Sequence, residues 1–342
     1  MKKKKRIFFI SKWAEKMSEV VKPQLEFSGK NYKDYIGWRK KFEKKFRELL
    51  GPFPQGVPLN PVIVLHREFP DYMAEKVIYD TERFMSVPAW VCYPRNKKKG
   101  EKLPVVICCH GHGDKSSMAG LDRKGKPVDE DYGKKIGIRL AREGFLTISP
   151  DWRCFGERRE PPERDPAPRD LCNMGNLLTQ TFGYNLLTLD IWDGLRTIEY
   201  LASRSDTDMS RLGCVGCSFG GTMTMFLTAA TEKIKASCIS GYLSATAKSF
   251  IWGTCGSQIL PELLQWGDRA EIAGLICPRP LLIQIGKYDS TFPSFYALQE
   301  FSRLKKIYDA AGVKDMLALD LFEGTHEINY PPILEWFNKW LK

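Results

Sequence analysis

Ser218 lies in a segment whose residue types and spacing suit a catalytic nucleophile. The pattern Gly216-x-Ser218-x-Gly220 follows a short apolar run, 212–215, and precedes a stretch free of glycine and proline, 222–231. This order predicts a buried strand, a tight turn centred on the serine, and a helix. The two glycines permit the strained turn, because side chains there would collide with the neighbouring strand and helix. The pattern is typical of a nucleophile elbow.

A serine becomes a nucleophile only when a base takes its proton and a third group orients that base. His326 is the one histidine that follows Ser218 in the chain, and it comes shortly after the apolar run 317–322. Asp289 comes shortly after another such run, 280–285. Because the carboxyl ends of parallel strands meet at one edge of a sheet, these three side chains can converge there. We therefore predict a catalytic triad of Ser218, His326 and Asp289.

Two other acidic residues near His326 were weighed for the role of the acid. Asp320 lies inside the predicted strand, and Glu323 is only three residues before the histidine. Asp289 follows a separate strand, which provides an independent anchor for the imidazole ring. The sequence favours Asp289.

A tetrahedral oxyanion needs hydrogen-bond donors aimed at it. The backbone N–H of Phe219 is one expected donor. The second is expected from the segment 110–113, of sequence HGHG, which ends the apolar run 103–109. We favour the backbone N–H of His112 over those of the two glycines. The side chain of His110 is expected to hold this loop in place.

Composition limits the other roles of the chain. Its 342 residues carry a net charge of +11, yet no nucleic-acid-binding motif accompanies the charge, so a solvated basic surface is expected. Ten cysteines, spread between residues 92 and 277, suit reduced core positions in a reducing compartment. With only four histidines, none spaced as a ligand pair with nearby cysteines, neither a metal nor another cofactor is expected.

The N-terminus superficially resembles a secretion signal. Five basic residues after Met1 precede the apolar segment 7–10, which is shorter than the about 7–15 residues of a signal core. No later stretch approaches the about 18 apolar residues of a membrane span. A cytoplasmic protein is expected, and homo-oligomers are left open.

The chain changes character along its length. Residues 1–60 predict a basic arm of weak pattern and then a helix over 34–50, with Asp34 as its N-cap and Gly51 as its stop. Alternating segments next predict antiparallel strands over the ranges 62–65, 75–81 and 87–93. From Leu103 onward, strands and helices alternate, which indicates a parallel sheet with crossover helices.

Two long segments leave the predicted sheet at its carboxyl edge, at about 155–185 and 241–275. Ligands bind at this edge in open α/β folds, so both segments are expected to form caps over the site. The second is rich in aromatic residues, of which Phe250 and Trp252 are the predicted substrate contacts.

The elbow, the HGHG loop, and the segments GKYDSTFP and EGTHEI together resemble the α/β-hydrolase superfamily. More narrowly, the chain is similar to its branch of dienelactone hydrolases and acetyl xylan esterases, although dienelactone hydrolases carry cysteine where this chain has Ser218. The resemblance implies a mostly parallel sheet with antiparallel N-terminal strands, helices on both faces and cap insertions, in a catalytic domain over 61–342. It also implies that Ser218, Asp289 and His326 are nucleophile, acid and base, and that His112 is an oxyanion donor.

These observations predict a serine carboxylic-ester hydrolase that acts through an acyl-enzyme on a small-molecule ester. Short-chain or acetyl esters, including acetylated carbohydrates, are the expected substrates. One alternative is a peptidase similar to prolyl oligopeptidase, but about 100 residues before the first strand of the parallel sheet cannot hold the β-propeller typical of such enzymes. Another alternative is a non-catalytic binding protein with a hydrolase fold.

Overall fold

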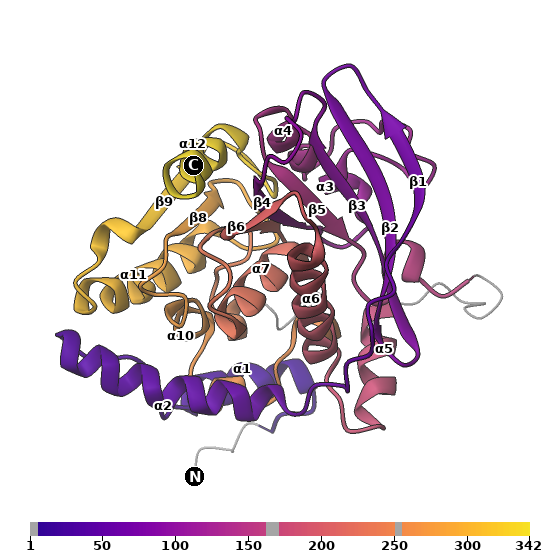
Figure 1. The fold of residues 1–342 in the computed structure, drawn as a ribbon. Helices are drawn as coiled ribbons and strands as arrows, with labels where there is room; N and C mark the ends of the chain where they lie inside the picture. Colours follow the sequence, from indigo (N-terminus) through magenta and orange to yellow (C-terminus); the bar gives the residue numbers. More distant parts are fainter. Residues whose placement is uncertain (1–5, 162–170, 250–254) are drawn as a thin grey trace, which may run out of the picture.

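The structure is a computed structural model that describes residues 6–161, 171–249 and 255–342. Within these residues the core is one nine-stranded sheet in the order β1-β2-β3-β5-β4-β6-β7-β8-β9 (Figure 1). The strands are β1 (Val62–Glu68), β2 (Tyr72–Glu82), β3 (Met85–Pro94), β4 (Leu103–Cys109), β5 (Leu146–Pro150), β6 (Thr207–Cys217), β7 (Ala236–Ser240), β8 (Leu281–Gly286) and β9 (Leu317–Phe322).

The direction of pairing divides this sheet into two parts. The pairs from β1 through β2 and β3 to β5 are antiparallel, and all pairs from β5 through β4 to β9 are parallel. This arrangement confirms the predicted fold class, a mostly parallel sheet with antiparallel N-terminal strands. The carboxyl ends of the parallel strands meet along one edge, where Ser218, Asp289 and His326 follow β6, β8 and β9.

Helices cover both faces of the sheet (Figure 1). They are α1 (Ile10–Val20), α2 (Tyr32–Leu50), α3 (Ser116–Ala119), α4 (Ile136–Arg142), α5 (Leu171–Gln180), α6 (Leu186–Ser203), α7 (Phe219–Ala230), α8 (Thr246–Ser249), α9 (Leu263–Trp266), α10 (Arg269–Gly274), α11 (Ser294–Ala310) and α12 (Tyr330–Leu341). Three short 3-10 helices are η1 (Gly156–Arg158), η3 (Gly256–Gln258) and η4 (Lys314–Met316).

The two-residue period of strand β4 explains why the sheet needs helices on both sides. Val105 and Ile107 belong to a core cluster with residues of α6, α7 and α10, whereas Val106 and Cys108 belong to a second cluster with α4 and α12. All four side chains are fully buried. A central parallel strand of this kind is apolar on both faces.

The N-terminal region differs from its prediction in two respects. Residues 10–20, expected to be weakly patterned, form helix α1, which has no fully buried residue. Helix α2 begins two residues before Asp34, because the N-cap is Asn31, whose side chain accepts the Asp34 N–H at 3.1 Å. Asp34 instead accepts the Lys30 N–H at 2.8 Å, so both residues satisfy donors at the helix start. The stop at Gly51, in a left-handed conformation with φ of 74°, is confirmed.

Helix α2 packs its aromatic face into the main core. Phe42 is fully buried, and a Cβ atom built on Gly267 would lie only 2.7 Å from its ring. The hydroxyl of Tyr35 donates to the carbonyl of Cys277 at 2.7 Å. The helix therefore belongs to the same packed body as the sheet. No described helix has the length and apolar character needed to cross a bilayer.

Two buried aspartates of α6 hold the segment that leaves β5. Asp193 pairs with Arg153 at 2.9 Å and with Arg158 at 2.8 Å. Asp190 accepts the backbone N–H of Arg153 through Oδ1 at 2.9 Å, while its Oδ2 has no partner in the described part of the chain. Burial, and next the charge of Asp193, raise the pKa of Asp190 to about 7.

Asp190→Asn tests the consequence of this raised pKa. In the folded protein the group keeps its proton above its ordinary pKa of 3.8, so its contribution to stability is full below that value and is lost as pH rises through about 7. The variant has no carboxyl group to ionise at this position. We therefore expect the difference in unfolding free energy, variant minus wild type, to rise by up to about 4 kcal/mol between about pH 4 and pH 8. Urea denaturation at both pH values measures this difference.

Asp193→Asn is the matched control, one helical turn away. Although burial opposes ionisation of Asp193, the charges of Arg158 and Arg153 hold its pKa below the ordinary value. Removing its charge takes away the carboxylate that buried Arg153 and Arg158 share and leaves Arg153 with Glu82, so we expect a loss of stability at both pH values. A difference between Asp190→Asn and wild type that does not change with pH contradicts the account.

Candidate active site

The turn at Ser218 has the backbone geometry of a nucleophile elbow. Ser218 adopts φ of 62°, a left-handed conformation that is unusual for a residue with a side chain. A Cβ atom on Gly216 would overlap the carbonyl of Gly220, and one on Gly220 would overlap the carbonyl oxygen of Cys109. Both positions therefore require glycine, because the start of α7 presses against the ends of β4 and β6.

Asp289 and His326 face each other across the ends of β8 and β9. His326 Nδ1 lies 2.8 Å from Asp289 Oδ2. The other carboxylate oxygen, Oδ1, accepts the backbone N–H groups of Thr291 at 2.8 Å and Phe292 at 2.9 Å. The carboxylate is thus fixed by its own turn. In a neutral imidazole whose Nδ1 donates to Asp289, Nε2 can accept a proton.

Ser218 and His326 both adjoin the end of β7. The Ser218 N–H donates to the carbonyl of Ser240 at 3.2 Å, and a Cβ atom on the next residue, Gly241, would lie 3.1 Å from His326 Nδ1. Phe292 stacks on the imidazole at 5.6 Å between ring centroids. Within the described residues, the Ser218 hydroxyl makes no hydrogen bond, which is common in sites without substrate.

The HGHG loop passes directly beside the serine. A Cβ atom on Gly111 would lie 3.1 Å from Ser218 Cβ. The Gly111 N–H is already taken, because it donates to the hydroxyl of Tyr132 at 2.7 Å. This contact argues against the Gly111 N–H as an oxyanion donor, and the N–H of His112 stays the predicted one. The Phe219 N–H lies in the first turn of α7, where helical N–H groups have no acceptor within the helix.

His110 anchors the loop from below. It is fully buried, and its Nε2 accepts the backbone N–H of Trp152 at 3.1 Å while Nδ1 lies 2.7 Å from the carbonyl of Gly111. These partners assign the proton to Nδ1. Burial lowers the pKa of His110, so the neutral ring that this pattern requires is favoured.

Asp151 attaches the beginning of the first cap to the same loop. Its Oδ1 accepts the backbone N–H of Lys115 at 2.9 Å, and its Oδ2 pairs with the ammonium of that lysine at 2.6 Å. Gly156, with φ of 55°, lies so close that a side chain would overlap the Asp151 carboxylate. The Gly156 N–H donates to the carbonyl of Gly113 at 3.2 Å. The cap and the HGHG loop are therefore held together from their first residues.

Tyr132 is a positioning residue that sequence reasoning missed. Besides its hydroxyl contact with Gly111, its backbone carbonyl accepts the N–H of Ile328 at 2.9 Å, two residues after His326. It thereby links the HGHG loop to the loop of the predicted base. Its spacing in the sequence carries no signal, since a lone tyrosine in a polar segment is not distinguished from a packing aromatic.

Cys217, the neighbour of the serine, points away from the site. Its side chain is fully buried in the cluster beneath α4 and α12. Burial raises the pKa of its thiol to about 12, which keeps it protonated and unreactive.

A cavity of about 320 Å³ opens between the HGHG loop and the first cap. Its lining consists of His112, Gly113, Cys154, Phe155, Arg159, Leu171 and Cys172. The predicted substrate contacts Phe250 and Trp252 lie outside the described residues. Within the described chain, the cavity beside the HGHG loop is thus walled by residues of the segment 155–185 and its border.

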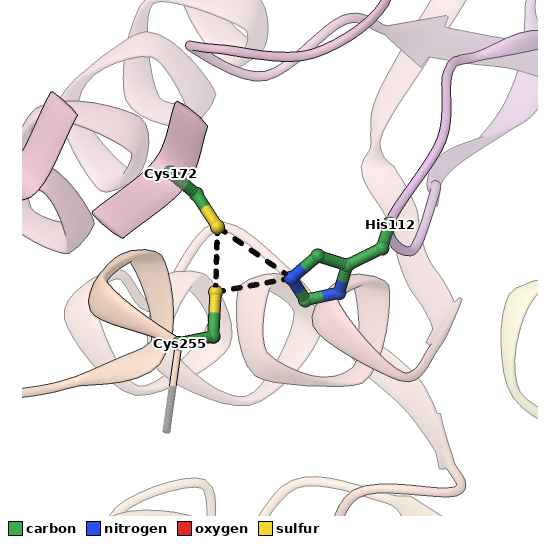
Figure 2. Close-up of side chains that lie close together, drawn as sticks. All are labelled: His112, Cys172 and Cys255. Carbon is green, nitrogen blue, oxygen red and sulfur yellow. Dashed lines mark hydrogen bonds between the residues drawn. The ribbon is translucent and has the colours of Figure 1, made fainter. Parts of the chain in front are cut away.

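The imidazole of His112 lies beside two cysteines (Figure 2). Its Nε2 is 3.0 Å from Cys255 Sγ and 3.8 Å from Cys172 Sγ. No metal was expected from four histidines without ligand spacing to nearby cysteines, yet the fold brings these three residues together from separate segments. Among the described residues, His112, Cys172 and Cys255 form a group whose ligand atoms lie close enough together to hold a metal ion.

The chain was compared with known proteins. The model of the Abhydrolase family matches residues 4–304. The chain belongs to the Abhydrolase family. The chain is also similar to a protein of Bacillus subtilis (strain 168) named "Putative hydrolase YtaP". The two sequences are 26% identical over 282 residues, which cover 80% of this chain and 88% of the relative.

Two solved structures share the fold of this Abhydrolase family member. One is described as a "putative acetyl xylan esterase" from Bacteroides fragilis NCTC 9343 and has a TM-score of 0.78 at 16% identity. The match covers 100% of this chain and 94% of the esterase chain. The other, "Methylesterase BT1017", has a TM-score of 0.71 at 23% identity. The match covers 96% of this chain and 68% of the methylesterase chain. The expected resemblance to α/β-hydrolases is confirmed at the level of family and fold, and membership supports a hydrolase.

Asp289→Asn tests which acid orients His326. The rivals are engaged elsewhere: Asp320 accepts hydrogen bonds from Gln284 and Asn329 at 2.9 Å, and exposed Glu323 pairs with Lys287. We expect Asp289→Asn to lower kcat by about 10⁴-fold, because the amide favours the wrong imidazole tautomer.

The matched control for this substitution is Glu323→Gln, for which we expect an unchanged kcat on the same ester. Steady-state hydrolysis measures both. A larger loss from Glu323→Gln than from Asp289→Asn assigns the acid to Glu323 instead.

Tyr132→Phe tests the positioning of the HGHG loop. The variant leaves the Gly111 N–H without its acceptor, so the loop can shift and move the neighbouring oxyanion donor. A lost oxyanion donor costs about 10²–10³ in turnover, and we expect a displaced one to cost about tenfold in kcat with little change in KM. Tyr330→Phe, at a half-buried tyrosine that begins α12, is the control. Equal kcat values for both variants and wild type would remove Tyr132 from the positioning network.

Proposed function

We propose that this chain is a serine carboxylic-ester hydrolase that uses Ser218 as nucleophile, His326 as base and Asp289 as acid. The observation that carries the proposal is the 2.8 Å contact between His326 Nδ1 and Asp289 Oδ2, at the sheet edge where the strained turn presents Ser218. Membership of the Abhydrolase family supports it.

Acylation follows from these positions. His326 Nε2 takes the proton of the Ser218 hydroxyl while Oγ attacks the ester carbonyl carbon. The carbonyl oxygen becomes an oxyanion, which the backbone N–H groups of Phe219 and His112 stabilise. Asp289 stabilises the imidazolium that forms. The imidazolium then gives its proton to the departing alcohol as the carbon–oxygen bond breaks, which leaves the acyl group on Ser218.

Deacylation repeats the sequence with water. His326 Nε2 takes a proton from a water molecule, the hydroxide attacks the acyl carbon, and the same N–H groups stabilise the second oxyanion. When this intermediate collapses, Ser218 leaves and regains its proton from His326, and the carboxylic acid departs. Every step uses side chains and backbone groups of the chain itself.

Short-chain or acetyl esters, including acetylated carbohydrates, are the proposed substrates. The similarity to proteins named acetyl xylan esterase and methylesterase supports this class. Selectivity is assigned to the cap segments 155–185 and 241–275, with Phe250 and Trp252 retained as candidate contacts. One or two methylene groups in such a pocket are worth roughly 1–3 kcal/mol.

The surrounding assignments belong to the same proposal. Residues 61–342 form the catalytic domain, and 1–60 pack on it through α2. A cytoplasmic location is supported by the ten cysteines, none of which forms a disulfide.

Hydrolysis of p-nitrophenyl acetate, butyrate and octanoate, and release of acetate from acetylated xylo-oligosaccharides, test the proposal. We expect wild type to favour the acetyl esters and Ser218→Ala to lose about 10⁴- to 10⁶-fold in kcat. Cys217→Ala, the adjacent control, should retain most activity because its side chain is buried away from the site.

The same panel separates the alternatives. Cleavage of prolyl peptides but not esters indicates the peptidase, and turnover of neither class by wild type indicates the binding protein. If Ser218→Ala keeps a tenth of wild-type activity, the nucleophile is wrongly assigned.

A further inference from the structure

We propose that His112, Cys172 and Cys255 bind one zinc ion, which ties both cap segments to the HGHG loop. His112 Nε2 lies 3.0 Å from Cys255 Sγ and 3.8 Å from Cys172 Sγ, and the two sulfurs lie 3.0 Å apart. Figure 2 shows the three side chains pointing at one another from separate parts of the chain. Nothing in the esterase mechanism uses the two thiols or the His112 imidazole.

The donor set selects the metal. One imidazole nitrogen and two thiolates suit zinc, whereas magnesium and calcium prefer oxygen. With zinc bonds of about 2.3 Å to sulfur and 2.0 Å to nitrogen, tetrahedral ligand atoms lie about 3.5–3.8 Å apart. The distances from Cys255 Sγ to His112 Nε2 and to Cys172 Sγ, both 3.0 Å, are therefore slightly too short for zinc. Side-chain shifts of less than about 1 Å bring them to the required values. Two cysteines and one histidine, with an open fourth position, form a known zinc ligand set.

The ligands are held in place without the metal. Cys172 is 2% exposed and Cys255 is 4% exposed. The residues beside them are joined, since the Gly256 N–H donates to Asn173 Oδ1 at 2.5 Å. A side chain on Gly256 would lie 2.6 Å from Asn176 Cβ, so the two segments need glycine there to approach. The site is therefore largely formed before the ion arrives.

Access comes from the cavity beside the HGHG loop. His112 is exposed, and its ring packs edge-on against Phe155 at 5.4 Å between centroids. Both His112 and Cys172 line the cavity, which lets the ion enter and gives a water molecule room to fill the fourth position. Binding one Zn²⁺ releases one proton from each thiol, so the site of two thiolates, neutral imidazole and ion carries no net charge.

The position of the ion suggests its role. Cys172 belongs to the first cap, Cys255 to the second, and His112 to the loop whose backbone N–H is the proposed oxyanion donor. A zinc ion there fixes the His112 backbone relative to both caps. It acts as a positioning element and takes no part in the ester chemistry. This role rests on the proposed function, whereas zinc binding does not.

Metal content tests the binding directly. Full-length protein is incubated with zinc under reducing conditions, desalted and analysed by mass spectrometry for bound metal. We expect about one zinc per wild-type chain and at least a tenfold loss in Cys172→Ser and Cys255→Ser. Cys154→Ser, at a cysteine that directly precedes the first cap and lies outside the triangle, is the control and should keep its zinc. Circular dichroism establishes that each variant is folded.

Cobalt substitution gives a second readout that does not depend on activity. We expect cobalt-loaded wild type and Cys154→Ser to show the thiolate-to-cobalt charge-transfer band, and Cys255→Ser to lose most of it. Zinc should raise the melting temperature of wild type and leave that of Cys172→Ser unchanged.

Two results overturn the inference: less than a tenth of a zinc per chain, or equal zinc in wild type and both serine variants. Failure of the esterase proposal is distinguishable, because it leaves zinc content untouched while Ser218→Ala keeps its activity.

Discussion

The close approach of α7 to the ends of β4 and β6 is the constraint on which the candidate site depends. It leaves no room for a side chain at Gly216 or Gly220, and it forces Ser218 into a left-handed conformation. Strain of this kind persists only where surrounding structure over-determines it. Here the buried faces of β4 and β6 supply that rigidity, so packing free energy of the core holds a reactive side chain at the surface of the sheet.

The same approach positions the groups around the serine. Gly111 lies against Ser218, its N–H donates to the hydroxyl of Tyr132, and the next residue, His112, is the proposed oxyanion donor. Buried polar groups then connect this loop to its surroundings: His110 binds the segment after β5, and Gly113 binds Gly156 of the first cap. Hydrogen bonds therefore connect the loop beside Ser218 to the segment that follows β5 and to the first cap. A zinc ion at His112 would extend these connections to the second cap.

Local periodicity was enough to predict much of the sheet and helix α2, because the continuous apolar run 103–109 and the helical spacing in 34–50 are properties of adjacent residues. The helix start at Asn31 was missed since Asp34 also suits a cap, and α1 was missed although Ile10, Trp13, Met17 and Val20 recur at helical spacing. The positions of Ser218, Asp289 and His326 after strand ends made them candidates. Tyr132 and the pair Cys172 and Cys255 act through contacts across 21 and 83 residues, which spacing cannot reveal.

The central claim is that Ser218 forms a covalent acyl-enzyme with His326 as its base. Labelling with a fluorophosphonate, followed by peptide mapping in a mass spectrometer, tests this most directly, because the reagent traps a serine whose proton a neighbouring base removes. The account predicts one adduct per chain, located on Ser218, and at least a hundredfold slower labelling in His326→Ala. An adduct on another residue, or labelling of Ser218 at the same rate without the histidine, would contradict it.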